Sequence, residues 1–363
     1  MSRLHDLLHY IVEVDASDLH LKVDNPPIIR LRGDLKRLEQ PALSHDEMHE
    51  TLFGILNESR KKTLMEEKEL DLSYAIEGLA RFRVNMYWQR GNIGAVFRLI
   101  PYQIRSIDDL GIPQVTKKLA MLPRGLIIVT GPTGSGKSTS LAAMISHINT
   151  NTRKHIITIE DPIEYVHADQ TSIINQREKG TDTHSFADAL RHVMRQNPDV
   201  ILVGEMRDLE TIQLAITAAE TGHLVFSTLH TVDAAQTIDR VVDVFEPDQQ
   251  EQIRTQLSVT LQAVVSQQLL PTKDGKGRVA AFEVLTATPS VRTLIREGKT
   301  HQLYLDIQTG SQFGMQTLDS HLLSLLKDGL IDYEHAESKC SNVSEFQRRA
   351  ANAGLMEVAS AAN

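Results

Sequence analysis

Hydrophobic and polar positions in the first hundred residues follow short helical and strand periods. Apolar residues over 4–11 recur at the spacing of one helix face, which predicts an amphipathic helix. Residues 79–88 alternate strictly between apolar and polar, and a turn at Gly91 leads into a second strand over 93–100. Gly33 marks a predicted hairpin turn between two shorter strands. These patterns favour an α+β domain over residues 1–100, with one solvated face on its antiparallel sheet.

A different pattern begins at residue 125. Short uninterrupted apolar runs alternate there with longer helical patterns, as is typical of buried parallel strands joined by helices. The runs lie at 126–129, 156–159, 200–203, 224–226 and 279–284. We therefore expect an α/β domain over 125–288. Residues 101–124 contain three prolines and are expected to be an interdomain linker with a short helix near 115–121.

The C-terminal part has mainly helical patterns. Residues 248–270 have the apolar spacing of one long amphipathic helix. Helical patterns then follow Pro289, which predicts a helical C-terminal segment over 289–345. The small and polar residues beyond it predict a disordered tail over 346–363.

Composition narrows the class of protein. Of the 363 residues, 41% are hydrophobic and 23% charged, which is typical of a folded globular chain. The formal net charge of −9 disfavours direct nucleic-acid binding. A single cysteine, Cys340, excludes an internal disulfide and a four-cysteine zinc site, so no zinc is expected. There is no apolar run of membrane-spanning length and no signal-peptide pattern at the N-terminus, so we expect a cytoplasmic protein.

The most specific motif follows the first strand of the α/β region. Its sequence is Gly131-Pro132-Thr133-Gly134-Ser135-Gly136-Lys137-Ser138, which fulfils every fixed position of the phosphate-loop pattern G-x-x-x-x-G-K-[ST]. The glycines allow backbone N–H groups to surround phosphate oxygens, Lys137 reaches the β- and γ-phosphates, and the Ser138 hydroxyl binds Mg²⁺. The sequence therefore predicts an ATP and Mg²⁺ site formed by residues 131–139, with Thr139 as the last of them.

Acidic residues follow two of the predicted strands. Glu205 comes just after the run at 200–203, and Glu160-Asp161-Pro162-Ile163-Glu164 follows the run at 156–159. In doubly wound sheets the carboxyl ends of the strands face the ligand. We expect Glu205 to hold Mg²⁺ and activate the attacking water, and Glu164 to position metal or water. The alternative for Glu205 is an ordinary surface glutamate, and the alternative for residues 160–164 is a solvated acidic loop.

Two histidines bracket the strand at 224–226. His230 lies at its ligand-side end, where it could sense the γ-phosphate or link subunits. His223 lies at the other end, where a structural role and a functional role are equally compatible with the sequence.

Arginine is the remaining requirement, because phosphoryl transfer often uses an extra guanidinium from a neighbouring subunit. The polar face of the N-terminal sheet offers Arg83 and Arg98, together with Arg81. A solvated strand face explains these arginines equally well. Arg207 and Arg240 are candidates from the α/β domain.

These and other segments resemble the secretion ATPase superfamily, and within it the type IV pilus retraction ATPases. The segments are Ala16–Leu21, 159–165 (the Asp box), 194–208 (around the Walker B strand), 221–230 (the His box) and Gly314–Asp319. The resemblance implies a PAS-like N-terminal domain, a RecA-like P-loop ATPase core and a helical C-terminal segment. It also implies a hexameric motor that hydrolyses ATP to drive pilus retraction and twitching motility. Membrane contact is implied to be indirect, through a platform protein of the inner membrane.

One family element differs slightly. The retraction element Ala-Ile-Arg-Asn-Leu-Ile-Arg-Glu reads Ser290-Val291-Arg292-Thr293-Leu294-Ile295-Arg296-Glu297 here, so both arginines remain. Extension motors commonly carry four zinc-binding cysteines, which a chain with one cysteine does not have. An accessory or scaffold subunit of the pilus or DNA-uptake machinery, with weak turnover, stays open as an alternative. A small-molecule kinase is a third possibility, although no acceptor-binding domain is apparent.

Overall fold

The structure is a computed structural model that describes residues 3–31, 33–100 and 104–355. It divides into two compact units, Met1–Gln103 with Pro162–Val166, and Ile104–Asp161 with His167–Asn363. The expected linker over 101–124 differs from this division. Ile107, Ile112 and Leu119 are buried in a core of the second unit, so its described residues belong to that unit; residues 101–103 lie outside the described residues.

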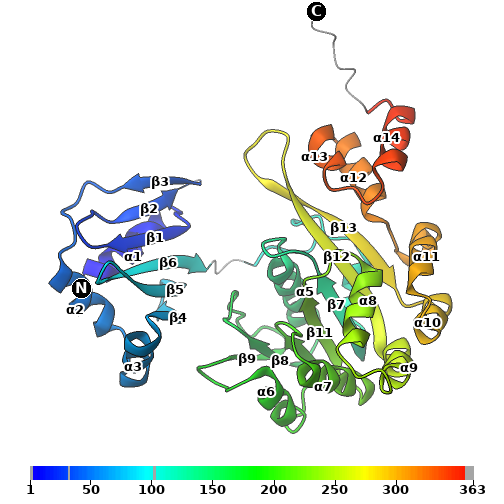
Figure 1. Cartoon of the computed structure of the whole chain (residues 1–363), viewed down its shortest axis with the longest axis horizontal. Helices are drawn as coiled ribbons and strands as arrows, with labels where there is room; N and C mark the ends of the chain where they lie inside the picture. The colour runs from blue at the N-terminus through cyan, green and yellow to red at the C-terminus, as the bar shows by residue number, and fades with distance from the viewer. Residues whose placement is uncertain (1–2, 32, 101–103, 356–363) are drawn as a thin grey trace, which may run out of the picture. The chain divides into compact units, whose positions relative to one another are not determined.

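The first unit is built on an antiparallel sheet with the strand order β3-β2-β1-β6-β5-β4 (Figure 1). Its elements are α1 (Arg3–Glu13), β1 (Asp18–Lys22), β2 (Ile28–Leu31), β3 (Asp34–Arg37), α2 (His45–Gly54), α3 (Glu58–Glu67), β4 (Glu69–Ile76), β5 (Ala80–Gln89) and β6 (Asn92–Ile100). The predicted first helix, hairpin and strand pair are confirmed. Helix α3 and strand β4 were not predicted.

The local sequence explains these elements. From Ala80 to Met86 every second residue of β5 is buried, as at Phe82 and Val84, and the residues between them are half-buried. Helix α1 buries one apolar face in the same core. Helix α2 begins after Ser44, whose hydroxyl accepts a hydrogen bond from the Glu47 N–H at 3.2 Å and so caps the helix.

The second unit contains a mainly parallel sheet with the order β13-β12-β7-β11-β10-β8-β9, in which only β13 runs antiparallel to its neighbour (Figure 1). Its first elements are α4 (Val115–Ala120), β7 (Gly125–Thr130), α5 (Lys137–Asn151), β8 (His155–Glu160), β9 (Ile173–Glu178), α6 (Phe186–Val193), β10 (Val200–Val203), α7 (Leu209–Glu220) and β11 (Leu224–Leu229). The predicted α/β fold with a parallel sheet is confirmed, and only β9 was not predicted among these strands.

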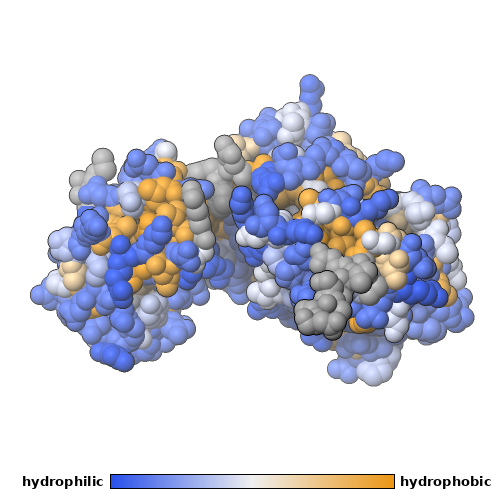
Figure 2. Space-filling model, turned by 90° about the horizontal axis from the view of Figure 1, so that it is seen from above, coloured by the Kyte–Doolittle hydropathy of each residue, from blue (hydrophilic) through white to orange (hydrophobic). Residues whose placement is uncertain are grey.

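Helices cover both faces of this sheet. Leu126 and Ile128 of β7 share a core with α6 and α7, whereas Ile127 and Val129 share another with α5. All six residues of β7 are buried, which is why their sequence lacks the alternation of a half-exposed strand. By contrast, much of the molecular surface seen in Figure 2 is hydrophilic.

The long helix expected over 248–270 is wrong. Helix α8 (Ala234–Asp243) is followed by α9 (Gln250–Thr260), and the chain then enters strands β12 (Leu261–Pro271) and β13 (Arg278–Thr286). Strand β12 pairs in parallel with β7 on one side and antiparallel with β13 on the other. These two ladders stabilise a strand where the apolar spacing alone also fitted a helix.

Helices form the remainder of the described chain. They are α10 (Pro289–Arg296), η1 (Thr300–Gln302), α11 (Leu303–Thr309), η2 (Ser311–Phe313), α12 (Leu318–Lys327), α13 (Tyr333–Glu337) and α14 (Val343–Asn352). The expected tail from residue 346 is wrong up to residue 352, because Phe346 and Ala350 of α14 are buried against α12 residues such as Leu322. Residues 356–363 lie outside the described residues.

The outer edge of β13 is covered by this C-terminal segment. Phe282 donates its N–H to Nδ1 of His321 on α12 at 2.9 Å. The backbones of Val284 and Gln316 exchange hydrogen bonds at 2.9 and 3.2 Å. Burial lowers the pKa of His321, which favours the neutral ring that accepts this bond. Separately, none of the described helices combines the length and the apolar character needed to cross a bilayer.

Candidate nucleotide site

The site is built where neighbouring parallel strands end. Strands β7, β11 and β10 are adjacent in the sheet. The phosphate loop follows β7, His230 follows β11, and Glu205 lies two residues beyond β10. Because the strands are parallel, these three features meet at one edge of the sheet, as predicted.

Glycine is required within the phosphate loop for steric reasons. Gly131 has φ +144°, and a Cβ atom there would lie 2.2 Å from the carbonyl oxygen of Gln267. Gly134 and Gly136 also have positive φ angles, of +78° and +89°. L-residues with a side chain rarely adopt such angles, so the backbone path of the loop depends on its glycines.

Polar atoms within the loop fit a polyphosphate. The ammonium group of Lys137 donates hydrogen bonds to the carbonyl oxygens of Gly131 at 2.8 Å and Pro132 at 3.1 Å. The hydroxyl of Ser135 is buried and has no hydrogen-bond partner among the described residues. Helix α5 begins at Lys137, so its positive end faces the same loop. These groups match the chemistry of a bound phosphate.

Two basic side chains lie beside Glu205. Its Oε2 lies 2.7 Å from Nε of Arg207 and 3.7 Å from Nε2 of His230. The Glu205 side chain is 19% exposed, so it is partly shielded but open to water. The preceding Gly204 donates its N–H to the Ile159 carbonyl at 2.8 Å, which fixes the end of β10 against β8. The prediction that Glu205 and His230 share a site fits this geometry.

A chain of threonine hydroxyls connects the His230 loop with the phosphate loop, and sequence reasoning missed it. Thr130, the last residue of β7, donates its hydroxyl to the Thr231 carbonyl at 2.6 Å. The Thr130 and Thr231 hydroxyls lie 2.7 Å apart, and the Thr231 hydroxyl lies 2.7 Å from that of Thr237 on α8. Threonine carries no distinctive motif signal, so only the folded arrangement reveals this connection.

Other candidates have different surroundings. Glu160 accepts hydrogen bonds from Thr158 at 2.6 Å and from Gln176 at 3.1 Å, on the β9 side of β8. Nδ1 of His223 lies 3.0 Å from the Ala218 carbonyl, at the amino end of β11, which supports its structural alternative. Arg240 is exposed in the last turn of α8 and is not brought to Glu205.

The first unit collects the remaining candidates. Arg83, Arg98 and Glu164 line a common cavity of about 170 Å³, because the segment Pro162–Val166 belongs to this unit. Arg83 and Arg98 are direct cross-strand partners, and Arg98 in turn pairs with Asp18. These residues and Arg30, the other partner of Asp18, form one row across the sheet. Like charges placed directly opposite each other repel, so the arginine row needs a negative charge.

Asp18 supplies that charge. Its carboxylate accepts a hydrogen bond from Nε of Arg98 at 2.8 Å and lies 3.6 Å from Nε of Arg30. Burial alone would raise the pKa of Asp18, but the hydrogen bonds from Arg98 and Ser17, together with the positive charge of Arg98, hold that pKa below its ordinary value. One carboxylate thus orients Arg98 within a row that keeps an excess of positive charge.

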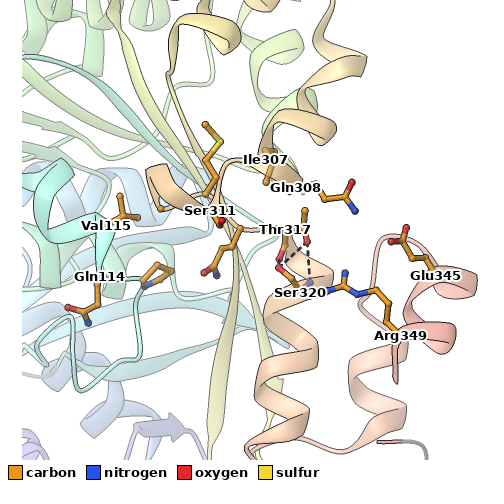
Figure 3. Close-up of a pocket in the computed structure, with 13 residues that line it drawn as sticks. Gln114, Val115, Ile307, Gln308, Ser311, Thr317, Ser320, Glu345 and Arg349 are labelled. Carbon is orange, nitrogen blue, oxygen red and sulfur yellow. Dashed lines mark hydrogen bonds between the residues drawn. The ribbon is translucent and has the colours of Figure 1, made fainter. Parts of the chain in front are cut away.

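A larger cavity lies in the second unit, away from the phosphate loop. It measures about 610 Å³ and is lined by residues from α11, α14 and the start of α12, among them Ile307, Ser320 and Arg349 (Figure 3). None of the predicted site residues lines it. Its wall is fixed in part by Thr317, which caps α12 by accepting the Ser320 N–H at 3.2 Å (Figure 3).

Comparison with known proteins is consistent with this site. The chain is 51% identical over 341 residues to the Type IV pilus retractation ATPase PilT of Pseudomonas aeruginosa, covering 94% of this chain and 99% of that protein. It is 42% identical over 341 residues to the Type IV pilus ATPase PilU of the same organism, covering 94% and 89%. A crystal structure of the pilus retraction motor PilT with bound ADP matches with a TM-score of 0.89 at 46% identity, covering 96% of this chain and 99% of that one.

The fold and the phosphate loop define a P-loop ATPase. The sequence also matches the Type II/IV secretion system protein family over residues 2–331. The chain belongs to this family, and the predicted resemblance to its pilus retraction branch is confirmed.

Proposed function

We propose that the protein is a motor ATPase that hydrolyses ATP to drive type IV pilus retraction. The observation that carries this proposal is the position of Glu205 with His230 and Arg207, at the same sheet edge as the phosphate loop. The similarity to pilus retraction ATPases along nearly the whole chain supports the pilus as the object of the work.

The chain's residues have separate tasks. The ammonium group of Lys137 donates hydrogen bonds to two loop carbonyl oxygens. When ATP binds, Lys137 donates to oxygens of the β- and γ-phosphates instead. Glu205 orients the attacking water and accepts its proton, while Arg207 and His230 hold the carboxylate in place. The hydroxyl chain through Thr130 and Thr231 keeps His230 in register with the loop.

Mg²⁺ fits the same group of residues. Ser138 offers a hydroxyl on the first turn of α5, and Glu205 offers a carboxylate at the same edge of the sheet. When bound, Mg²⁺ neutralises phosphate charge during transfer of the γ-phosphoryl group. Hydroxyl and carboxylate oxygens are the ligands that Mg²⁺ prefers.

We further propose that Arg83 and Arg98 complete the site of a neighbouring subunit in a homo-hexamer. Their row carries more arginine than carboxylate, which suits it to the negative charge of a γ-phosphate. The motor would act at the cytoplasmic face of the inner membrane, through an integral platform protein of the pilus machinery.

The replacement Glu205→Gln tests the catalytic assignment. It keeps the size of the side chain and removes its basicity. We expect ATP turnover to fall by about 100-fold or more, with the dissociation constant for ATP unchanged. Glu251→Gln, an exposed change on α9, is the matched control. Turnover at the parent rate in Glu205→Gln would show that another group activates the water.

Mixing two damaged chains tests the shared site. Lys137→Ala disables the phosphate loop but keeps the arginines, and Arg98→Ala does the reverse. Mixed rings should regain part of the ATPase activity that each variant lacks alone. No recovery, in mixtures shown to exchange subunits, would exclude Arg98 as a residue that acts on a neighbour.

The accessory-subunit alternative has a separate test. The 42% identity to PilU keeps a paralogue of the retraction motor in consideration. Expression in a piliated bacterium that lacks its retraction motor distinguishes the two functions. Restored twitching with the parent chain, and none with Glu205→Gln, supports a motor; failure of an ATPase-active parent chain supports an accessory role.

A further inference from the structure

Gln267 on β12 contacts the phosphate loop from behind. Its side chain is buried, with 3% of the residue exposed. Its Nε2 donates a hydrogen bond to the Ser135 carbonyl at 2.7 Å, and its Oε1 accepts one from the Ser140 hydroxyl at 2.7 Å. Both ends of one amide are therefore used, one on the loop and one on helix α5.

The loop also packs closely on this residue. A Cβ atom at Gly131 would lie 2.2 Å from the Gln267 carbonyl oxygen, and one at Gly136 would lie 2.8 Å from its Nε2. The first and the third glycine of the motif thus face Gln267 without space for a methyl group. Two of the motif's glycines are explained by this contact as well as by their φ angles.

We propose that Gln267 is a positioning residue for the nucleotide site, fixing the phosphate loop in its binding conformation. The inference rests on the proposed function of that loop. The carbonyl of Ser135 and the N–H of Gly136 belong to one planar trans peptide, in which they point in opposite directions. By holding this carbonyl toward β12, Gln267 turns the Gly136 N–H away from β12, toward the side open to phosphate oxygens.

Gln267 is itself held firmly. In the β12–β13 ladder it lies opposite Phe282, whose N–H is bound by His321 and whose carbonyl accepts a hydrogen bond from the Gln316 side chain at 3.0 Å. Its position is therefore defined by the sheet and by the C-terminal helices together. A fixed donor costs less to align than a mobile one when the nucleotide binds.

The experiment measures the affinity for a fluorescent ADP analogue and the steady-state kinetics of ATP hydrolysis. Gln267→Ala removes both hydrogen bonds, and Gln267→Glu replaces the donor to Ser135 with an acceptor. Each should raise the dissociation constant for ADP and KM for ATP by about 10-fold or more, and change kcat by less than about 3-fold. Gln268→Ala is the matched control, because the next residue of a strand points to the other face of the sheet.

A double-mutant cycle tests the route of the effect. Ser140→Ala alone should weaken ADP binding by a few-fold, and should add little to Gln267→Ala because the partner is already lost. Ser140→Ala also keeps the proposal testable if the Gln267 variants do not fold. Unchanged ADP affinity in a folded Gln267→Ala variant would overturn the proposal. If Gln267→Ala does not fold, unchanged ADP affinity in Ser140→Ala would overturn it instead.

Lys137→Ala distinguishes this proposal from the proposed function of the site. If Lys137→Ala abolishes ADP binding and Gln267→Ala leaves it unchanged, the nucleotide site stands and the positioning role fails. If Lys137→Ala binds ADP normally, the nucleotide site itself is wrongly placed.

Discussion

Nε of Arg207 and Nε2 of His230 converge on the same oxygen of Glu205, its Oε2, at 2.7 and 3.7 Å. These two contacts of the described residues engage one carboxylate oxygen, and in the proposed mechanism the other oxygen, Oε1, accepts the hydrogen bond of the attacking water. The Arg207 side chain is 70% exposed, so burial adds little strength to the Arg207–Glu205 ion pair. Its contribution is to fix the direction of the carboxylate. The proposed mechanism thus assigns the acceptance of the proton to Glu205 and the orientation of its carboxylate to Arg207 and His230.

Replacing Arg207 with alanine tests that division. Glu205 should remain a base but lose its fixed orientation, so we expect kcat to fall by about 10-fold with little change in KM for ATP. Steady-state phosphate release measures both values. Arg191→Ala removes the same charge from a side chain that pairs with Asp188 and Glu210, and should leave both values unchanged. A larger effect on KM than on kcat in Arg207→Ala would indicate that Arg207 binds nucleotide instead.

Gly131→Ala should disrupt the phosphate loop. The new Cβ would approach backbone of β12 at 2.2 Å, and backbone moves less readily than a flexible side chain. We expect the free energy of unfolding to fall by about 2 kcal/mol or more. Gly134→Ala is the matched comparison, because Gly134 has φ +78° but no heavy atom within 4 Å of a built Cβ. Its cost should be limited to backbone strain of about 1 kcal/mol; equal costs would contradict the steric argument.

Asp18→Asn should destabilise the protein in a pH-dependent way. The pKa of Asp18 is held below its ordinary value of 3.8, so the folded state binds fewer protons there than the unfolded state. The stabilisation is present above about pH 4 and is lost as pH falls through the lowered pKa. Denaturant unfolding at neutral pH should show a loss of about 1.5–3 kcal/mol.

The difference between the parent and Asp18→Asn should shrink below pH 4. A difference that is constant from pH 3 to pH 7 would show that the charge of Asp18 is not its cause.

Glu283→Gln should have the opposite sign. Glu283 lies buried on β13 and accepts the Ala234 N–H at the start of α8 at 2.9 Å. Burial raises the pKa of Glu283 from 4.5 to about 7, although the Ala234 hydrogen bond opposes the shift. The folded state therefore binds the extra proton, and its stability declines as pH rises from about 4.5 to about 7.

The glutamine variant keeps an acceptor for Ala234 and has no charge to bury. We expect it to be more stable than the parent by about 1–3 kcal/mol at pH 8, with the advantage vanishing toward pH 4.5. Thermal unfolding across this range measures the effect. Glu251→Gln should show no such trend, since that residue is exposed. A Glu283→Gln variant less stable than the parent at pH 8 would refute the prediction.

The sequence predicted those parts of the fold whose patterns are local. The parallel strands were apparent because a strand buried on both faces has an uninterrupted apolar run, as at 126–129. The junction at Thr260 was missed because no glycine or proline interrupts the pattern where α9 becomes β12. Only pairing with β7 and β13, which are distant in sequence, decides that the second half is a strand.

The site shows the same limit. The sequence could single out Lys137 and Glu205 as candidates because Lys137 stands in a motif and Glu205 follows closely after a predicted strand. Gln267 and Thr231 could not, because their roles depend on contacts with residues more than a hundred positions away. The grouping of Pro162–Val166 with the first unit is likewise a property of packing rather than of composition.

The cover over the outer edge of β13 has a practical consequence. An edge strand with unpaired backbone groups recruits other strands, and β13 is long and largely apolar. Here His321 and Gln316 form hydrogen bonds with the backbone N–H and C=O groups of Phe282 and Val284, so these groups are not available to another strand. A chain cut before Gln316 would therefore lose more than its last helices: it would leave the outer edge of β13 without these hydrogen-bond partners, and should aggregate during expression instead of yielding a smaller soluble enzyme.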